Sequence, residues 1–311
     1  MPRRPRSKGI RPKRPRRVVP KAGVELEKFT GGDLRTWQRQ AEKLERFHVQ
    51  LFFHLEGLRA VHHDSLCTAL CSSTAADITL KSWVRIIDYE FSLEPLSAAG
   101  SLVHGGRFNI GRDLDATKYP AFPALYLAEN YETAYEERFG QRPSRHAPLA
   151  GHEFALRTPE SFTAINVDGK VVNLFDLRDT KSLKVFTDVI TSFDVPKELR
   201  ELAVSVGIKK PLLVRNAGAL KKTLLAKEWR QYPSQYEIPA NPQVFGRLAV
   251  DAGFDGIIYP STKGPNACIA LFPTNFAKSD SFVEIADAPP VGVRKTRLDC
   301  TTWRSIAAPP A

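Results

Sequence analysis

The chain has 311 residues, of which 42% are hydrophobic and 25% charged, a composition typical of a globular protein and not of a disordered or fibrous one. No apolar run approaches the roughly 18 residues needed to cross a bilayer, and the N-terminus lacks the apolar core of a signal peptide, so we expect a cytoplasmic protein with no membrane partner. The formal net charge of +11 is local, because ten Lys and Arg residues and no acid lie within residues 1–21, which leaves +1 for the remainder. Bulk charge therefore gives no support for a nucleic-acid groove in the folded part.

Residues 1–24 are predicted to form a disordered tail, because Arg and Lys alternate with Pro and almost nothing apolar is available to bury. Residues 1–21 could bind nucleic acid or an acidic partner through counterion release, or they could be solvated without an activity of their own. The four cysteines of the chain are scattered and form no CxxC pair, which favours a reducing compartment.

Residues 25–78 are predicted to form a helical extension. From Gly32 onward apolar residues recur at spacings of three and four, which indicates one long amphipathic helix whose face of mixed charge favours packing on the main domain over membrane binding. A continuing helix would place His63, Cys67 and Cys71 on one face. Because no fourth ligand follows at zinc spacing, we interpret them as residues of a helix interface and predict no metal.

Residues 79–285 alternate short strands with helices, which predicts an α+β domain with a mixed β-sheet and flanking helices. After Asp287 periodicity is lost, so residues 286–311 are predicted to be a weakly ordered tail. The expected strands are residues 82–87, 121–128, 148–156, 162–167, 254–261 and 267–272, with a turn at 166–170, and the expected helices are residues 179–191, 196–206, 219–230 and 243–250.

The strand at residues 82–87 alternates in period two and places Arg85 on the face of Trp83 and Ile87. An arginine among apolar neighbours needs an anionic partner. That partner could be a structural carboxylate or a bound phosphate.

Residues 103–139 bring a cation and a carboxylate together within one loop, strand and helix. Gly105 and Gly106 precede Arg107, and a helical pattern that follows holds Glu136 and Glu137. Motifs of P-loop, Rossmann, serine hydrolase and zincin sites are absent from the sequence. Two arginines can hold a pyrophosphate, and a carboxylate can bind ribose hydroxyls and stabilise the positive charge that develops as nicotinamide leaves NAD. The pattern predicts a nucleotide-sugar site.

The segment GGRFNIG, then FPALYLAENYETAYEE and, far downstream, GFDGIIYPS with Asn266 and the strand at 267–272 resemble the RES-domain family over about residues 80–275. The resemblance implies an ADP-ribosyltransferase-like fold. It also implies a bacterial toxin of a toxin–antitoxin system that degrades NAD by phosphorolysis or hydrolysis and is neutralised by an Xre-type antitoxin protein.

By this resemblance the family's arginine falls on Arg107, its glutamate on Glu137, three residues after Ala134, and its serine on Ser261. These are the implied catalytic residues. The first-strand arginine falls on Arg85, although Ile86 follows it where some relatives have an aromatic residue. The candidate residues for binding NAD are Arg85, Arg107, Tyr126, Asn109 and Asn266.

Tyr126 could be a core residue or could stack on a ring of the ligand. Asn109 and Asn266 could stabilise turns or could form hydrogen bonds to the ligand. The expected activity is that of an NAD phosphorylase or NAD glycohydrolase, with NAD as substrate and phosphate or water as acceptor. Transfer of ADP-ribose to a macromolecule is one rival, and a non-enzymatic nucleic-acid-binding protein that acts through its basic tail is another.

Overall fold

The computed structural model describes residues 31–73, 75–140, 161–208 and 213–308. The chain divides into two compact units, Met1–Ala41 and Glu42–Ala311. The second unit contains every described strand and every described helix except the first part of α1. Among the described helices, none is long and apolar enough to cross a bilayer.

The predicted long helix is present as α1 (Gly31–Val61), which begins in the first unit and continues into the second. From Glu42 onward its apolar side faces the core, where Phe47 is buried and Phe52, Leu55 and Leu58 pack against other hydrophobic residues. A separate short helix, α2 (His63–Cys71), follows and buries Leu66 and Leu70. The amphipathic periodicity of the sequence therefore locates these two helices.

The sheet is mixed, which confirms the predicted α+β class. Its order is β1-β2-β5-β4-β3-β6-β7, β3 and β4 are parallel, and the other pairs are antiparallel. Because β1 also pairs with β3, five of the strands close into a ring, and β6 and β7 extend from β3. Closure removes open strand edges. The strands are β1 (Ala76–Asp88), β2 (Leu125–Ala128), β3 (Phe162–Asp176), β4 (Gly256–Pro260), β5 (Ala267–Leu271), β6 (Phe282–Ile285) and β7 (Arg297–Leu298).

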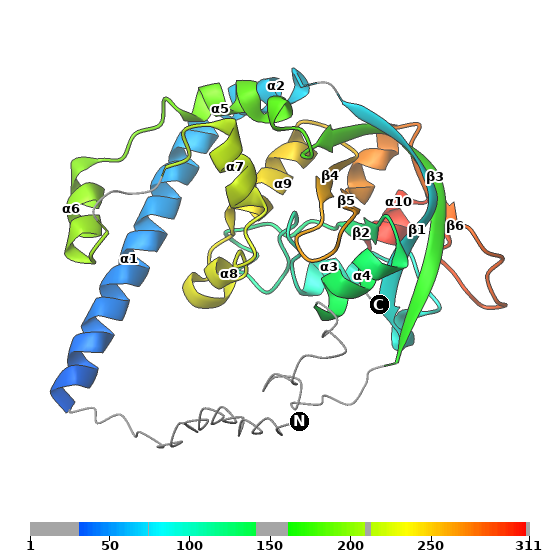
Figure 1. Ribbon diagram of the computed structural model, residues 1–311, viewed down its shortest axis with the longest axis horizontal. Helices are drawn as coiled ribbons and strands as arrows, with labels where there is room; N and C mark the ends of the chain where they lie inside the picture. The colour runs from blue at the N-terminus through cyan, green and yellow to red at the C-terminus, as the bar shows by residue number, and fades with distance from the viewer. Residues whose placement is uncertain (1–30, 74, 141–160, 209–212, 309–311) are drawn as a thin grey trace, which may run out of the picture. The chain divides into compact units, whose positions relative to one another are not determined.

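Helices cover the sheet, and the long curved pair of β1 and β3 borders it on one side (Figure 1). The remaining α-helices are α3 (Ala99–Val103), α4 (Tyr131–Phe139), α5 (Lys184–Ile190), α6 (Lys197–Ser205), α7 (Ala217–Leu224), α8 (Gln231–Tyr236), α9 (Asn241–Asp251) and α10 (Trp303–Ala307). Short 3-10 turns are η1 (Tyr89–Phe91), η3 (Thr180–Leu183) and η4 (Pro273–Lys278).

The core consists of two hydrophobic clusters, one on each face of the sheet. The first cluster contains Phe108, Phe175 and Phe245 with residues of α2, α5, α7 and α9, and the second contains Leu80, Trp83, Leu271, Leu298 and Ile306 with residues of η4 and α10. Alternation along β2 illustrates the division, since Leu125 and Leu127 face the second cluster while Tyr126 packs against the first. A residue's place along a strand therefore decides on which side of the sheet it acts.

The expected turn at residues 166–170 is wrong, because β3 runs through it without interruption. Gly169 pairs with β1 on one edge and with β6 on the other. A Cβ on Gly169 would lie 2.3 Å from the carbonyl oxygen of Phe282. The glycine thus serves the close approach of β6 and not a change of chain direction.

The C-terminal residues also differ from the expected weakly ordered tail, because they add β7 and α10 to the fold. Leu298 on β7 and Ile306 on α10 are both fully buried in the second cluster. Elements this short bury one residue each, too few to produce a period in the sequence. The helix expected at residues 219–230 is α7, which ends at Leu224, and the strand expected at residues 148–156 lies outside the described residues.

Candidate functional site

Helix α4 carries Glu137 and begins directly after β2. The Asn130 side chain accepts a hydrogen bond from the backbone N–H of Thr133 at 2.9 Å, which caps the helix. Ala134 is buried in the first cluster, and Glu137, one helical turn later, is half-buried on the same side. The helix ends at Phe139 and is followed by Gly140, whose φ is 90°. Capping and burial therefore hold the Glu137 carboxylate against the domain.

The end of β4 supplies the partners of that carboxylate. The Ser261 hydroxyl donates to Oε1 of Glu137 at 2.5 Å, and the backbone N–H of Thr262 donates to the same oxygen at 3.0 Å. Oε2 accepts no hydrogen bond from the described part of the chain. Ser261 itself is oriented by the N–H groups of Lys263 and Gly264, which donate to its Oγ. One carboxylate oxygen is thus fixed and the other is left for a ligand.

The loop after β4 is fastened to α4 at several further points. The Lys263 ammonium donates to the carbonyl of Glu137 at 2.7 Å, and a Cβ on Gly264 would lie 2.8 Å from Cα of Thr133. Asn266 closes the loop, because its carbonyl accepts from the N–H of Ser261 and its side-chain oxygen accepts from Asn130. These contacts use Asn266 to hold the loop.

Arg107 reaches the same place from the loop after α3. It is 9% exposed, and its Nη1 donates to the carbonyls of Leu224 and Ala226 at 3.2 and 2.8 Å. Its Nη2 donates to the hydroxyl of Thr262 at 3.0 Å. A guanidinium has five N–H donors, so two remain without a partner among the described residues. Thr262 therefore joins the Arg107 guanidinium to the Glu137 carboxylate.

The electrostatics of Arg107 follow from this position. Burial lowers its pKa, and the nearby Tyr259 and Glu137 oppose that effect. The guanidinium also lies 5.9 Å from the ring of Trp229. A buried cation with unused donors beside a carboxylate is suited to an anionic ligand with hydroxyl groups.

Tyr126 and Asn109 shape the loop that carries Arg107. The Tyr126 hydroxyl donates to Oδ1 of Asn109 at 2.9 Å and accepts from the N–H of Phe108 at 3.0 Å. Asn109 is fully buried, and its Oδ1 also accepts from the N–H of Gly106 at 2.8 Å. Burial raises the pKa of the Tyr126 phenol. Asn109 also donates to the carbonyls of Ser101 and Phe122, so both side chains use their polar groups to hold this loop within the protein.

Arg85 is not brought to this group of residues. A bulge at Ser82, where φ is 53°, keeps Trp83 in the second cluster, and alternation places Arg85 on that same face, away from Glu137. Its Nη2 donates to the carbonyl of Ser97 at 2.7 Å, while its Nε is buried without a partner among the described residues. Burial and the nearby Arg138 lower its pKa to about 10. Of the candidate arginines, Arg107 alone contacts the Glu137 network.

The structure adds three residues to the site that the sequence patterns do not single out. Thr262 bridges Arg107 and Glu137, and Trp229 faces Arg107. Tyr259 is 5% exposed, and burial raises its pKa well above the usual value. Thr262 and Tyr259 flank the Pro260-Ser261 pair, so proximity to that motif is the signal that could have found them.

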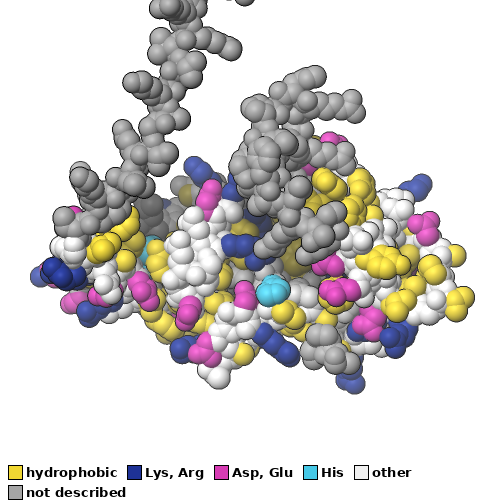
Figure 2. All heavy atoms as spheres, turned by 90° about the horizontal axis from the view of Figure 1, so that it is seen from below, with side chains coloured by type: hydrophobic (Ala, Val, Ile, Leu, Met, Phe, Trp, Pro, Cys, Tyr) yellow, Lys and Arg dark blue, Asp and Glu magenta, His cyan; other side chains and the backbone are white. Residues whose placement is uncertain are grey.

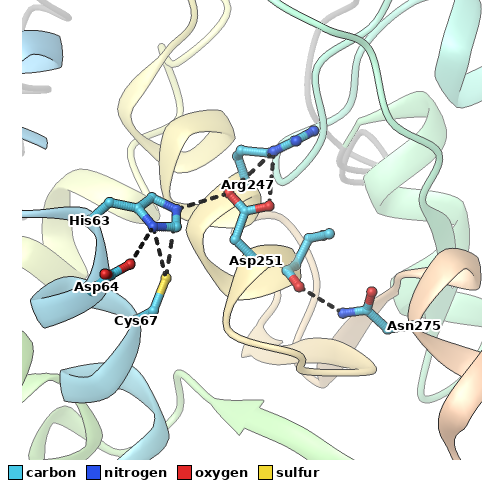
Figure 3. A network of polar contacts seen from close by, with 7 residues as sticks. His63, Asp64, Cys67, Arg247, Asp251 and Asn275 are labelled. Atoms are coloured by element: carbon cyan, nitrogen blue, oxygen red, sulfur yellow. Dashed lines mark hydrogen bonds and ion pairs between the residues drawn. The ribbon is translucent and has the colours of Figure 1, made fainter. Parts of the chain in front are cut away.

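His63 of α2 joins this helix to α9 through Asp251, and Cys67 lies beside His63 on α2, as Figure 3 shows. His63 lies 3.3 Å from Oδ2 of Asp251 and 3.8 Å from Sγ of Cys67, and Cys71 donates to the carbonyl of Ala252. The hydrogen bond to Asp251 raises the pKa of His63, and burial raises that of Cys67 to about 11. Within the described residues, no group of three or more His, Cys, Asp or Glu is arranged to hold a metal ion. The contacts fit a helix interface.

The face drawn in Figure 2 has acidic and basic side chains intermingled where described residues form the surface. That part of the face therefore has no continuous positive patch of the kind that binds a polyanion.

Comparison of the chain with known protein families finds one family. A family model described as the RES domain matches residues 82–293, more than half of the chain. A solved structure, the crystal structure of the M. tuberculosis MbcT–MbcA toxin–antitoxin complex, is 13% identical to the chain, with 78% of this chain and 96% of that one covered and a TM-score of 0.38. No curated protein sequence matches.

Proposed function

The chain belongs to the RES domain family, and from this membership we propose that it cleaves the bond between nicotinamide and ribose in NAD, with water or phosphate as acceptor. The observation that carries the proposal is the network of Ser261, Glu137, Thr262 and Arg107, in which a fixed carboxylate and a buried cation with spare donors adjoin each other. The ADP-ribosyltransferase-like fold implied by the resemblance is part of this proposal.

In the proposed reaction Oε2 of Glu137, which accepts no hydrogen bond from the described residues, binds a hydroxyl of the nicotinamide ribose. As the C–N bond breaks, its electron pair passes to the pyridinium ring, and the same carboxylate stabilises the positive charge that develops on the ribose. Ser261 and Thr262 donate to Oε1 and keep the carboxylate in place. The oxygen of water or phosphate then bonds to the anomeric carbon, and for water the released proton goes to solvent.

The pyrophosphate is assigned to the N–H groups of Arg107 that make no hydrogen bond to the described residues. Arg230 offers a second cation on this side, because its guanidinium stacks on Trp229 at 4.4 Å and is exposed. The assignment leaves out Arg85, which lies on the other face of the sheet and donates to the carbonyl of Ser97. Tyr126 and Asn109 act through the loop they hold, and Asn266 through the loop after β4.

The test is to incubate purified full-length protein with NAD, with and without phosphate, and to identify the products by mass. ADP-ribose indicates water as acceptor, and a phosphorylated ADP-ribose indicates phosphate. Intact NAD under both conditions, with no binding of ADP-ribose, contradicts the proposal. A macromolecule modified in proportion to the nicotinamide released would instead identify an ADP-ribosyltransferase.

The matched variants are Glu137→Gln and Glu136→Gln, which remove one carboxylate each from adjacent positions of α4. The Glu136 side chain makes no hydrogen bond within the described residues, whereas Glu137 accepts two. We expect the Glu137 variant to lose turnover by about 100-fold or more while its unfolding curve changes little. The Glu136 variant should retain most activity, and equal losses in the two would remove the special role of Glu137.

As a member of a toxin–antitoxin pair, the protein is proposed to deplete NAD in the cell and to bind a cognate antitoxin protein of the Xre type. Co-expression with that antitoxin should restore growth. The Glu137→Gln variant should bind that partner as the native chain does. Growth inhibition that persists in the Glu137 variant would point to an effect other than NAD cleavage.

A further inference from the structure

A cavity of about 170 Å³ lies between the second half of α1 and helices α5, α7 and α9. Its walls are mainly apolar and include Leu51, Leu55, Ile190, Leu220, Val244 and Leu248. An engineered apolar cavity of about 150 Å³ stays dry and binds benzene, so this volume suits a small hydrocarbon group. Neither Glu137 nor Ser261 lines it, so the cavity is separate from the proposed NAD site.

One charged side chain, Arg59 of α1, is present among the described residues that line the cavity. Its side chain is 15% exposed, and its guanidinium lies 5.3 Å from the ring of Phe52. Nε donates to Oε2 of Glu56 at 2.8 Å. Nη2 forms an ion pair with the same oxygen at 2.7 Å. The geometry of that contact is not that of a hydrogen bond, and the buried Nη2 makes no hydrogen bond to any described residue.

The guanidinium therefore uses one of its five donors on a carboxylate whose own side chain is 51% exposed and free to turn toward water. A buried arginine with unused donors at the wall of an apolar cavity is the arrangement that a carboxylate with a hydrocarbon body satisfies. His48 also lines the cavity, and burial lowers its pKa, which disfavours its charged form. It adds no competing charge.

The last turn of α7 separates the cavity from Arg107. Leu220, Thr223 and Leu224 line the cavity, and the carbonyl of Leu224 accepts from Nη1 of Arg107 at 3.2 Å. A molecule in the cavity would contact the same turn that holds this arginine.

We propose that the cavity binds a small amphipathic monocarboxylate, whose carboxylate pairs with Arg59 and whose hydrocarbon body fills the space between α1, α7 and α9. Binding is sensed by Arg107 through the carbonyl of Leu224. Binding in this cavity is independent of NAD cleavage and is measured without NAD.

The test compares hexanoate with 1-hexanol, which has the same chain without the charge, by calorimetric titration of the full-length protein. The native chain should bind hexanoate at least tenfold more tightly than hexanol. Arg59→Gln should abolish that preference, and Arg46→Gln, which changes an exposed arginine of the same helix, should retain it. Leu220→Phe, which fills the cavity, should weaken both probes.

Thermal unfolding of each variant separates loss of the site from loss of the fold. The Nε–H resonance of Arg107, identified by its loss in Arg107→Lys, should shift when hexanoate is added to the native chain and not to the Arg59 variant. Absence of saturable binding to the folded native chain, equal affinity for the two probes, or an unchanged preference in Arg59→Gln would overturn the binding site. An unmoved Arg107 resonance at saturation would overturn the link through α7.

Discussion

Replacing Tyr126 by Phe removes one hydroxyl beneath the candidate site and leaves the ring in the first cluster. That hydroxyl accepts from the N–H of Phe108 at 3.0 Å and donates to Oδ1 of Asn109 at 2.9 Å. In the variant Asn109 keeps its hydrogen bond from Gly106, so it stays satisfied. The Phe108 N–H loses its partner within a residue that is 0% exposed. An orphaned buried donor costs about 1–3 kcal/mol, and we expect a loss of about 2 kcal/mol in the free energy of unfolding.

The assay is urea unfolding of the full-length protein, in which the midpoint should fall while the slope stays constant. Tyr131→Phe is the matched control, because Tyr131 lies on α4, is 42% exposed and makes no side-chain hydrogen bond within the described residues. It should change stability by less than about 0.5 kcal/mol. Equal stability of the Tyr126 and Tyr131 variants would show that the phenol does not support the Arg107 loop.

Ile306→Ala should lower stability by about 2–4 kcal/mol in urea unfolding, because Ile306 is fully buried in α10, whereas Val291→Ala at an exposed position should change it by less than about 0.5 kcal/mol. Equal effects would contradict the packing of the C-terminus. Burial raises the pKa of Asp299, but hydrogen bonds from Thr301 outweigh it and hold that pKa below its usual range. A carboxyl whose pKa is lowered on folding stabilises the fold at pH values above its unfolded pKa of about 3.9, and this stabilisation is lost as the pH falls. Asp299→Asn should therefore lower the free energy of unfolding by about 1–2 kcal/mol at pH 7 and by less at pH 3. A constant difference would refute the linkage. Deletion of residues 1–21 should leave NAD turnover per mole unchanged, and its loss would favour a function of the basic segment.

Periodic segments of the sequence led to the right elements. The spacing of Leu and Phe predicts α1, and the short apolar runs before Pro260 and Pro273 predict β4 and β5. In each case many residues repeat one constraint, either a buried helix face or a strand buried on both sides. Such patterns predict an element reliably because the prediction does not depend on any single residue.

Single residues that respond to distant partners were harder to interpret. Gly169 has the appearance of a turn glycine, yet the carbonyl of Phe282, more than a hundred residues away, is what excludes a side chain there. Likewise, Leu298 and Ile306 become core residues only because β6 and η4 offer surfaces to them. The sequence around each of these residues does not indicate which distant residues it will contact.

In the candidate site, too, some residues could be predicted from sequence motifs, whereas others depend on contacts between distant parts of the chain. The blocks around Arg107, Glu137 and Ser261 are readable from the sequence, and the structure brings these three side chains to one place. The role of Thr262 as their bridge is a consequence of the loop conformation and has no motif of its own. The place of Arg85 depends on the bulge at Ser82, which sets the strand's alternation, and strand periodicity alone leaves open which face of a sheet holds the ligand.

The contact between Ser261 and Glu137 also bears on the order in which the protein is made. Arg107 and Glu137 are translated well before Ser261 and Thr262. Ser261 follows Glu137 by 124 positions, and all of β3 and α9 lie between them. A ribosome that has synthesised the first half of the chain therefore holds a carboxylate with no donor to orient it. If the site cleaves NAD, the activity arises only when synthesis of the chain is nearly finished. An inhibitor therefore has the duration of translation in which to reach the nascent protein.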